Sequence, residues 1–460
     1  MAQLFKAGEQ KIRPGVYYRY SNGGKTALPA AIDGVNAIVL KASWGPVGVV
    51  TSHKTASSVK ETYGSGDGVD AALQLFKAGA STVYIYRPEG TGGVEGTVTA
   101  STGTFTAKHV GARALSVKIQ AKPGDSTKKE CLVLDGSTQV EKVEFAVSSD
   151  KELSALKAAL ENSKYVGFVF TSDGTATVGK YDLTGGKDPS VTTQDYVNGF
   201  YALEPYRYNV LSTDSIDAAV AQAMDAYADE AAVSGKNIIC VAGAPTTETF
   251  DNRCAGAKGY NDKKVVYFGS GFVTAEGTVN GVKAINYAAG VIAATPSNQS
   301  IVHTVISEAT DTTEKLTNAQ YERAIENGLL LLSTGPDGQV WFDSGVNTLT
   351  TLSSEEDAGW KKIKRTKVRF ELLDRIDRAV APLVGKINCD ADGVAAVMQA
   401  AMGIITTMTA ERKLLAGGSI VEDIENPRTA DSAWFVIAVD DIDTMEKIYL
   451  HYKFRYSQNA

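Results

Sequence analysis

The chain has 460 residues, 43% of them apolar and 22% charged, and its net charge of −7 comes from interspersed charges of both signs. This length allows two to four domains with a sizeable core, and this balance of charge gives no reason to expect a nucleic-acid partner. A disulfide framework or zinc site is not expected, because the cysteines are far apart: Cys131, Cys240, Cys254 and Cys389.

The first residues, MAQLFKAGEQKIRPG, lack the apolar core of a signal peptide, and no apolar run approaches the about 20 residues of a membrane span. We therefore expect a protein made in the cytoplasm and not inserted in a membrane. Residues 1–30 look like an arm. After Pro14-Gly15, the side chains of Val16, Tyr18 and Tyr20 alternate with others, which predicts a short strand before the SNGG loop.

An α/β segment is expected over residues 31–92. VNAIVLKAS and STVYIYRP read as strands, and SSVKETYG and GVDAALQLFKAGA between them read as helices. GTGGVEG, residues 90–96, then reads as a hinge-like linker. The sequence pattern changes over residues 93–182, where short predicted strands alternate with Gly, Lys-Pro-Gly and Asp-Gly turns around one predicted helix. We expect an inserted β-rich domain here, a β-sandwich or barrel.

The α/β alternation resumes over residues 183–350, with helices at 215–233 and 316–327 and strands such as NIICVAG and KVVYFGS. Residues 351–460 predict an α+β domain. One helix there has apolar residues at helical spacing and two i,i+4 ion pairs, Glu371–Arg375 and Asp374–Arg378. A second long helix precedes two strands, AWFVIAV and the last segment of the chain.

That last segment, EKIYLHYKFRYSQNA, alternates with a period of two. Ile448, Leu450, Tyr452 and Phe454 share one face, which predicts a half-buried strand. No hairpin can follow it, and an open strand edge is a template for pairing with another chain. The alternative is an internal edge strand that pairs with AWFVIAV.

Motifs for chemistry are weak. GTGGVEG does not match GxGxxG, and the four histidines, His53, His109, His303 and His451, have no partner at metal-ligand spacing. Ser270 in GSGF reads as a turn. We therefore expect no catalytic residue, no cofactor and no metal. A hydrolase with an α/β catalytic domain and an accessory β-domain is the alternative, and a secreted adhesin is a third class that the missing signal peptide disfavours.

The order of segments resembles the contractile phage tail sheath proteins, a family that also builds the sheaths of R-type bacteriocins and related injection systems. PGVYYRYSN resembles its N-terminal arm. ETYGSGDGVDAALQLFKAGASTVYIYRP and LTGGKDPSVTTQDYVNGFYALEPYRYNVL resemble its first segment and the return from its insertion. NGLLLLSTGPDGQVWFDSGVNTLTT, KVRFELLDRIDRAVAPLVGKINCD and DTMEKIYLHYKFRY are similar to the later parts.

The resemblance implies a middle domain of subtilisin-like topology, with no protease activity implied. It also implies a homo-oligomer of stacked rings or a helical sheath, held by exchanged terminal strands: Val16, Tyr18, Tyr20, Ile448, Leu450, Tyr452 and Phe454. The subunits would surround an inner tail tube, meet baseplate and tail terminator proteins, and contract. The location would be the tail of a virion or particle assembled in the bacterial cytoplasm, with hinges at 21–24 and after Asp431.

KKIKRTKVR, residues 361–369, carries six positive charges without interleaved aromatic residues. Nucleic-acid binding is the more specific interpretation, and a solvated or protein-facing patch is the one that we favour. Given the resemblance, Lys361, Lys362 and Lys364 are candidates to face an acidic inner tube.

Overall fold

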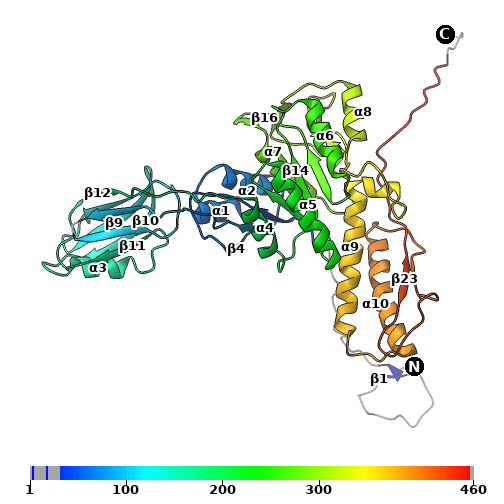
Figure 1. Ribbon diagram of the computed structural model, residues 1–460, viewed down its shortest axis with the longest axis horizontal. Helices are drawn as coiled ribbons and strands as arrows, with labels where there is room; N and C mark the ends of the chain where they lie inside the picture. The colour runs from blue at the N-terminus through cyan, green and yellow to red at the C-terminus, as the bar shows by residue number, and fades with distance from the viewer. Residues whose placement is uncertain (1–2, 5–16, 19–31, 101, 456–460) are drawn as a thin grey trace.

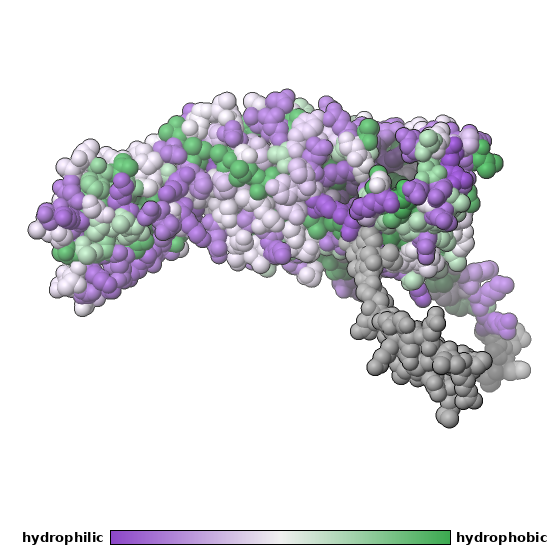
Figure 2. Space-filling model, turned by 90° about the horizontal axis from the view of Figure 1, so that it is seen from below, coloured by the Kyte–Doolittle hydropathy of each residue, from purple (hydrophilic) through white to green (hydrophobic). Residues whose placement is uncertain are grey.

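The computed structural model describes residues 3–4, 17–18, 32–100 and 102–455. The molecule is elongated: a β-rich domain lies at one end, a central α/β body in the middle, and a helical domain at the other end (Figure 1). The last described residues leave the helical domain as an extended arm (Figure 1). Hydrophilic and hydrophobic residues are interspersed along the body in the view from below (Figure 2).

A seven-stranded sheet forms the central body, in the order β19-β15-β14-β13-β3-β5-β4. Neighbouring strands are parallel except β4, which pairs antiparallel with β5 as an edge strand. Because β3 pairs with β13, residues before and after the β-rich domain share this sheet. The strands are β3 (Val35–Val39), β4 (Val50–His53), β5 (Thr82–Tyr86), β13 (Val210–Thr213), β14 (Ile239–Gly243), β15 (Val265–Phe268) and β19 (Leu329–Leu330).

Both faces of this sheet are covered, because successive residues of a strand point to opposite faces. Ile38 packs with apolar residues of helices α2 and α7 on one face. Its neighbours Ala37 and Val39 pack with those of α4 and α5 on the other. The helices of the body are α1 (Ala56–Tyr63), α2 (Asp67–Lys77), α4 (Thr193–Ala202), α5 (Ala218–Val233), α6 (Phe250–Tyr260), α7 (Val282–Ala294) and α8 (Asn318–Glu326).

Two small sheets extend the body, one from residues before α8 in the chain and one from residues after it. A three-stranded sheet has the order β17-β16-β18, and β20 pairs with β21. A capping box begins α8, since Thr317 and Gln320 bond each other's backbone N–H groups. These strands are β16 (Phe272–Thr274), β17 (Gly277–Val279), β18 (Ala309–Thr312), β20 (Leu332–Thr334) and β21 (Val340–Phe342).

The β-rich domain has two sheets and one helix around a core of its own. Its sheets have the orders β10-β9-β8-β12 and β11-β7-β6. Phe105, Val117 and Val133 are fully buried between the sheets, and Leu156 of the helix packs on them. The elements are β6 (Thr97–Ala100), β7 (Gly103–Ala107), β8 (Leu115–Ala121), β9 (Lys128–Asp135), β10 (Thr138–Ala146), α3 (Glu152–Ala159), β11 (Val166–Phe170) and β12 (Gly179–Asp182).

The segments that lead into and out of this domain are hydrogen-bonded to each other. Thr91 pairs with Ser190 and Val94 with Lys187, in antiparallel bridges with N···O distances of 2.8–3.0 Å. The interpretation of 90–96 as a hinge-like linker is therefore wrong, because its backbone groups are bonded to the returning chain. A paired ribbon bends less freely than a single Gly-rich chain.

Trp44, which follows β3, also fixes the β-rich domain to the body. Its side chain is 3% exposed and belongs to the core of the β-rich domain rather than to the body. It stacks on Tyr165 with ring centroids 6.0 Å apart, and the Arg113 guanidinium lies over it. From the body, buried Arg87 donates to the carbonyls of Gly45 and Val110.

The C-terminal domain packs two long helices against each other and against a two-stranded sheet. Val368 and Leu372 of α9 contact Ile404 and Met408 of α10. The two expected i,i+4 ion pairs on α9 are confirmed, Arg375–Glu371 at 2.6 Å and Arg378–Asp374 at 3.5 Å. The elements are α9 (Ile363–Val380), α10 (Ala391–Ala410), β22 (Ser419–Glu422), β23 (Phe435–Ala438) and the short 3-10 helices Ala358–Lys361 and Ala381–Leu383.

By length and composition alone, α10 could cross a membrane, which the sequence analysis did not anticipate. Its buried residues pack on α9, and the core helix of a folded domain passes the same test of length and hydropathy. The expected fold class, mixed α/β with several sheets, is confirmed. The subtilisin-like topology and the domain boundaries at 30, 92, 182 and 350 stay predictions.

Candidate assembly site at the root of the C-terminal arm

The arm, which we define as residues 447–455, is exposed along its length. Ile448, Leu450, Tyr452 and Phe454 are 69%, 68%, 70% and 94% exposed. Within the described part of the chain, this segment forms no strand. The half-buried strand expected here is therefore not formed within the described residues, and AWFVIAV, the alternative partner, instead contains β23 paired with β22.

The main chain just before the arm is bonded to the body of the C-terminal domain. The amide of Leu415 donates to the carbonyl of Asp440 at 2.8 Å, and the amide of Ile442 donates to the carbonyl of Lys413 at 2.9 Å. Leu414 and Asp441 form an antiparallel bridge. Residues 440–442 are therefore held by backbone hydrogen bonds to the loop that follows α10.

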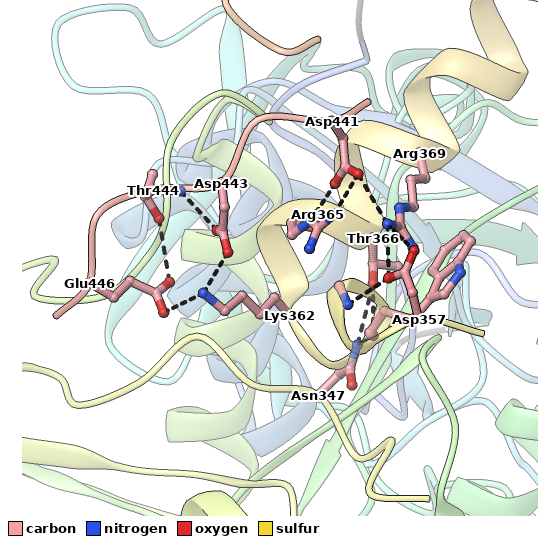
Figure 3. A network of polar contacts seen from close by, with 12 residues as sticks. Asn347, Asp357, Lys362, Arg365, Thr366, Arg369, Asp441, Asp443, Thr444 and Glu446 are labelled. Atoms are coloured by element: carbon pink, nitrogen blue, oxygen red, sulfur yellow. Dashed lines mark hydrogen bonds and ion pairs between the residues drawn. The ribbon is translucent and has the colours of Figure 1, made fainter. Parts of the chain in front are cut away.

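Side chains add an ionic clamp at the same place (Figure 3). The Asp441 carboxylate accepts from Nε and Nη2 of Arg365 at 2.6 and 2.7 Å and from Nη2 of Arg369 at 3.0 Å. The side chain of Asp441 is 8% exposed. Burial opposes the charged form, but the hydrogen bonds from the two arginines outweigh it and hold the pKa of Asp441 at about 2.

Farther along, the contacts are more exposed. The Lys362 ammonium lies 2.7 Å from Asp443 and 2.8 Å from Glu446 (Figure 3). Ser300 Oγ donates to Glu446 at 3.3 Å. We call residues 440–446 the arm root. Three of its acidic residues therefore face the basic start of α9, and the arm projects from there.

The three lysines expected to face a tube take different positions. Lys361 Nζ donates to the carbonyl of Thr350 at 2.5 Å, and Lys362 forms the ion pairs with the arm root described above. Lys364 is only 3% exposed, so its ammonium is not offered to a partner in this form. Burial lowers the pKa of Lys364. The basic run is thus engaged largely within the subunit, and the tube contact stays a prediction.

The sequence analysis missed the acidic residues of the root. Asp441, Asp443 and Glu446 lie in DDIDTMEK, directly before the basic arm. A compact acidic run and a compact basic run, KKIKRTKVR, in one domain are the signal that could have found the clamp. The pairing could not be seen in the sequence, because Arg365 and Asp441 are separated by 76 positions.

For the N-terminal arm, Val16 and Tyr20 lie outside the described residues. Tyr18 belongs to a short strand, β2 (Tyr17–Tyr18), which pairs parallel with β1 (Gln3–Leu4). The expected role of these residues between subunits stays a prediction.

An apolar surface on β22 and β23 lies in the same domain as the arm. Val421 and Val436 are cross-strand neighbours that are 51% and 47% exposed, and Trp434 beside them is 42% exposed. Each strand of this two-stranded sheet has one edge without a partner strand among the described residues. The loop 422–431 has four acidic residues and one basic residue, whereas the arm has three basic residues and no acidic one.

Candidate catalytic groups do not assemble in the described chain. His53 contacts Ser58 at 2.7 Å, but its other ring nitrogen faces the hydroxyl of Thr51, where a triad would need a carboxylate. Ser270 is 3% exposed, and its Oγ accepts from the amide of Leu332. The other histidines lie apart: His109 beside Trp44, His303 stacked on Trp341, and His451 on the arm.

A cleft of about 550 Å³ lies outside the carboxyl ends of β3, β5 and β13, where α/β enzymes hold ligands. Two of its carboxylates are already bonded, since Asp214 accepts from the amide of Lys41 and Asp188 from the hydroxyl of Ser43. The third, Asp67, is fully exposed to solvent. No histidine lines the described part of this cleft. Nothing in its geometry favours the hydrolase alternative.

A group of three aspartates, Asp225, Asp229 and Asp262, is compact enough to hold a metal ion. The ammonium of Lys264 lies 2.7 Å from both Asp229 and Asp262. A lysine therefore already pairs with two of the three carboxylates, and we assign no metal to this cluster.

Comparisons with known proteins agree with this architecture. A family model described as "Phage tail sheath protein central domain" matches residues 190–348. The uncharacterized protein YqbK of Bacillus subtilis is 22% identical, over 97% of this chain and 98% of its own length.

Among solved structures, the sheath tail protein of Desulfitobacterium hafniense has a TM-score of 0.72 at 23% identity, covering 93% of this chain and all of that one. The helical sheath of the anti-feeding prophage in its contracted state has a TM-score of 0.54 at 12% identity, covering 97% and 99%. Residues 190–348 are therefore similar to the central domain of phage tail sheath proteins, and the chain as a whole has the fold of tail sheath proteins.

Proposed function

We propose that this chain is the structural subunit of a contractile tail sheath, which polymerises around an inner tube and contracts to drive the tube through a target cell envelope. It acts without catalysis or a cofactor. The observation that carries the proposal is an arm with four exposed apolar side chains at alternate positions and no strand partner among the described residues of its own chain. Such a segment gains most by adding to the sheet of another subunit.

The acceptor in this proposal is the β22–β23 sheet of a second copy. It offers open strand edges, an exposed apolar pair in Val421 and Val436, and an acidic loop opposite in charge to the arm. Main-chain hydrogen bonds contribute about 0.5–1.5 kcal/mol each, so a strand that makes several supplies a few kcal/mol per junction. Because the junction is repeated around every ring, the polymer would be more stable than the free monomer.

Strand exchange suits a structure that changes shape. Backbone hydrogen bonds connect neighbours through extended arms, so the folded bodies can rotate while the mesh stays joined. The partners in this proposal are further copies of the chain, an inner tail tube, and baseplate and tail terminator proteins. The particle tail is assembled in the bacterial cytoplasm.

The tube contact needs a revised test. Charge reversal at Lys362 would break the arm-root clamp as well as any tube contact, and Lys364 is buried. Lys361→Glu is the cleaner variant. It should weaken binding to an acidic tube more at low salt than at high salt, because exposed charges are screened over about 8 Å at physiological ionic strength. Equal binding by variant and parent at every salt concentration would reject the contact.

Deletion of residues 447–460 tests the sheath proposal. The truncated chain should melt cooperatively as a monomer and form no rings or tubes in electron micrographs, whereas the full chain assembles. Leu450→Pro should behave similarly, because proline removes a backbone donor and clashes within a sheet. Leu450→Val is the matched control, since valine keeps the strand and its apolar face. Assembly by the truncated chain at the parent's concentration would contradict the proposal.

A further inference from the structure

The arm root has an inner part that is held firmly and an outer part that is held loosely. Asp440 and Ile442 are fixed by backbone hydrogen bonds, and the Asp441 carboxylate by three hydrogen bonds from arginines. Beyond Ile442, the contacts are side-chain contacts near the surface, and those of Asp443 and Glu446 with Lys362 are ion pairs. The expected pivot after Asp431 therefore moves to the peptide after Ile442.

Lys364 is anomalous in this network. Its Nζ atom is buried and has no hydrogen-bond partner within the described chain. A buried ammonium without a partner is unfavourable, and burial accordingly lowers the pKa of Lys364. The acidic groups that oppose this shift are Asp443 first and Asp441 second, so both carboxylates lie within electrostatic reach.

Of these two carboxylates, only Asp443 is free to change partner. Asp441 is shared by Arg365 and Arg369, and its departure would leave two arginines without their partner. Among the described residues, Asp443 makes a single ion pair, with Lys362, and Lys362 keeps a second partner in Glu446 at 2.8 Å. If Asp443 moved to Lys364, no cation would lose its last carboxylate and the orphaned ammonium would gain one.

We propose that the arm root has two positions on α9: one with Asp443 on Lys362, as in this structure, and one with Asp443 on Lys364, which turns the arm to a second direction about the peptide after Ile442. The device belongs to the single subunit. Its use, to let one arm follow its acceptor while the sheath changes shape, rests on the proposed function. The bistable element is small and local, as in other switches that exchange one charged partner for another.

The test uses the full chain at a concentration too low for assembly, in a Cys389→Ser background. Spin labels at Met445→Cys, which is 81% exposed, and at Glu326→Cys on α8 report the distance from the outer root to the body. The three remaining cysteines are buried and should stay unlabelled. The parent should show two distance populations, and Lys364→Met should lose the second one.

Two further variants complete the design. Asp443→Asn should also lose the second population, which provides an independent reading if Lys364→Met does not fold. Lys361→Met, in the same basic run, should keep both populations, because the Lys361 side chain donates to the carbonyl of Thr350 and forms no ion pair with the arm root among the described residues. A single population in the parent, or two populations that persist in both Lys364→Met and Asp443→Asn, would overturn the inference. Because the readout is on monomers, either result leaves the sheath proposal to its own test.

Discussion

Arg365 and Asp441 form a two-pronged ion pair, with Nε–Oδ2 and Nη2–Oδ1 distances of 2.6 and 2.7 Å. The arginine lies in the first turn of α9, and the aspartate lies where the chain leaves the C-terminal domain. This fork geometry fixes orientation as well as distance. The direction in which the arm leaves the subunit is thus tied to the helix that packs against the central body.

Asp441→Asn should destabilise the subunit. The amide cannot satisfy both arginines, and hydrogen bonds between charged groups contribute about 1.5–3 kcal/mol each. We expect a loss of that order in the free energy of unfolding, measured by denaturant titration of the truncated, monomeric chain. Asp377→Asn, an exposed position on the same helix, should change it by less than about 0.5 kcal/mol. Equal effects of the two substitutions would contradict the clamp.

The same carboxylate predicts a pH dependence. Its folded-state pKa of about 2 lies below its ordinary value of 3.8. The stabilisation is therefore complete above the ordinary value and is lost as the pH falls through the folded value. The difference in unfolding free energy between the parent and Asp441→Asn should shrink as the pH falls from about 5 to about 2. A difference that stays constant over this range would show that Asp441 is not the group responsible.

Trp44→Ala should loosen the β-rich domain from the body. Removing a buried tryptophan typically costs about 3–5 kcal/mol, and here the cavity opens where the two parts meet. Calorimetry should show a separate, earlier transition for the β-rich domain in the variant. Tyr181→Ala, which trims an aromatic residue packed against that core within the domain, is the comparison. It should lower the stability of the domain without separating it from the body. A single shifted transition in Trp44→Ala would show that Trp44 is not needed to couple the two.

Replacing residues 93–182 by a short Gly/Ser linker should leave a folded body, since the domain has its own core. The deletion also uncovers Trp44. We therefore expect the deletion combined with Trp44→Ser to be more soluble than the deletion alone, as measured by the soluble fraction after expression. If both chains are insoluble, the β-rich domain is part of the folding unit of the body.

Local patterns in the sequence predicted most elements of the fold, because hydrophobic periodicity reports burial directly. VNAIVLKAS became β3, and the alternation in 93–182 became two sheets. Strands β4 (VTSH) and β12 (GKYD) were missed, because their short polar sequences are strands only through their neighbours. No local pattern could show that Trp44 of the body completes the core of the β-rich domain.

The candidate site was predicted only in part. The period of two over residues 447–455 predicted a half-buried strand, whereas the described segment is exposed and forms no strand in this subunit. Its pairing with another subunit stays a prediction. The clamp was not foreseen, because ion pairs between distant segments leave no periodicity. Lys364 shows the same limit, since a lysine within a basic run is normally solvated and here is buried.

Mixed-copy crosslinking tests the central claim, that the arm of one subunit binds the β22–β23 sheet of another. In a Cys389→Ser background, copies with Leu450→Cys are mixed with copies with Val436→Cys, assembled, and treated with a short thiol crosslinker. Copies with Val233→Cys, a 91% exposed position on α5, replace the acceptor in the control. We predict covalent dimers of one copy of each kind, and none with the Val233→Cys control. Assembled particles that give no mixed dimers, or a doubly substituted chain that crosslinks only within itself, would contradict the account.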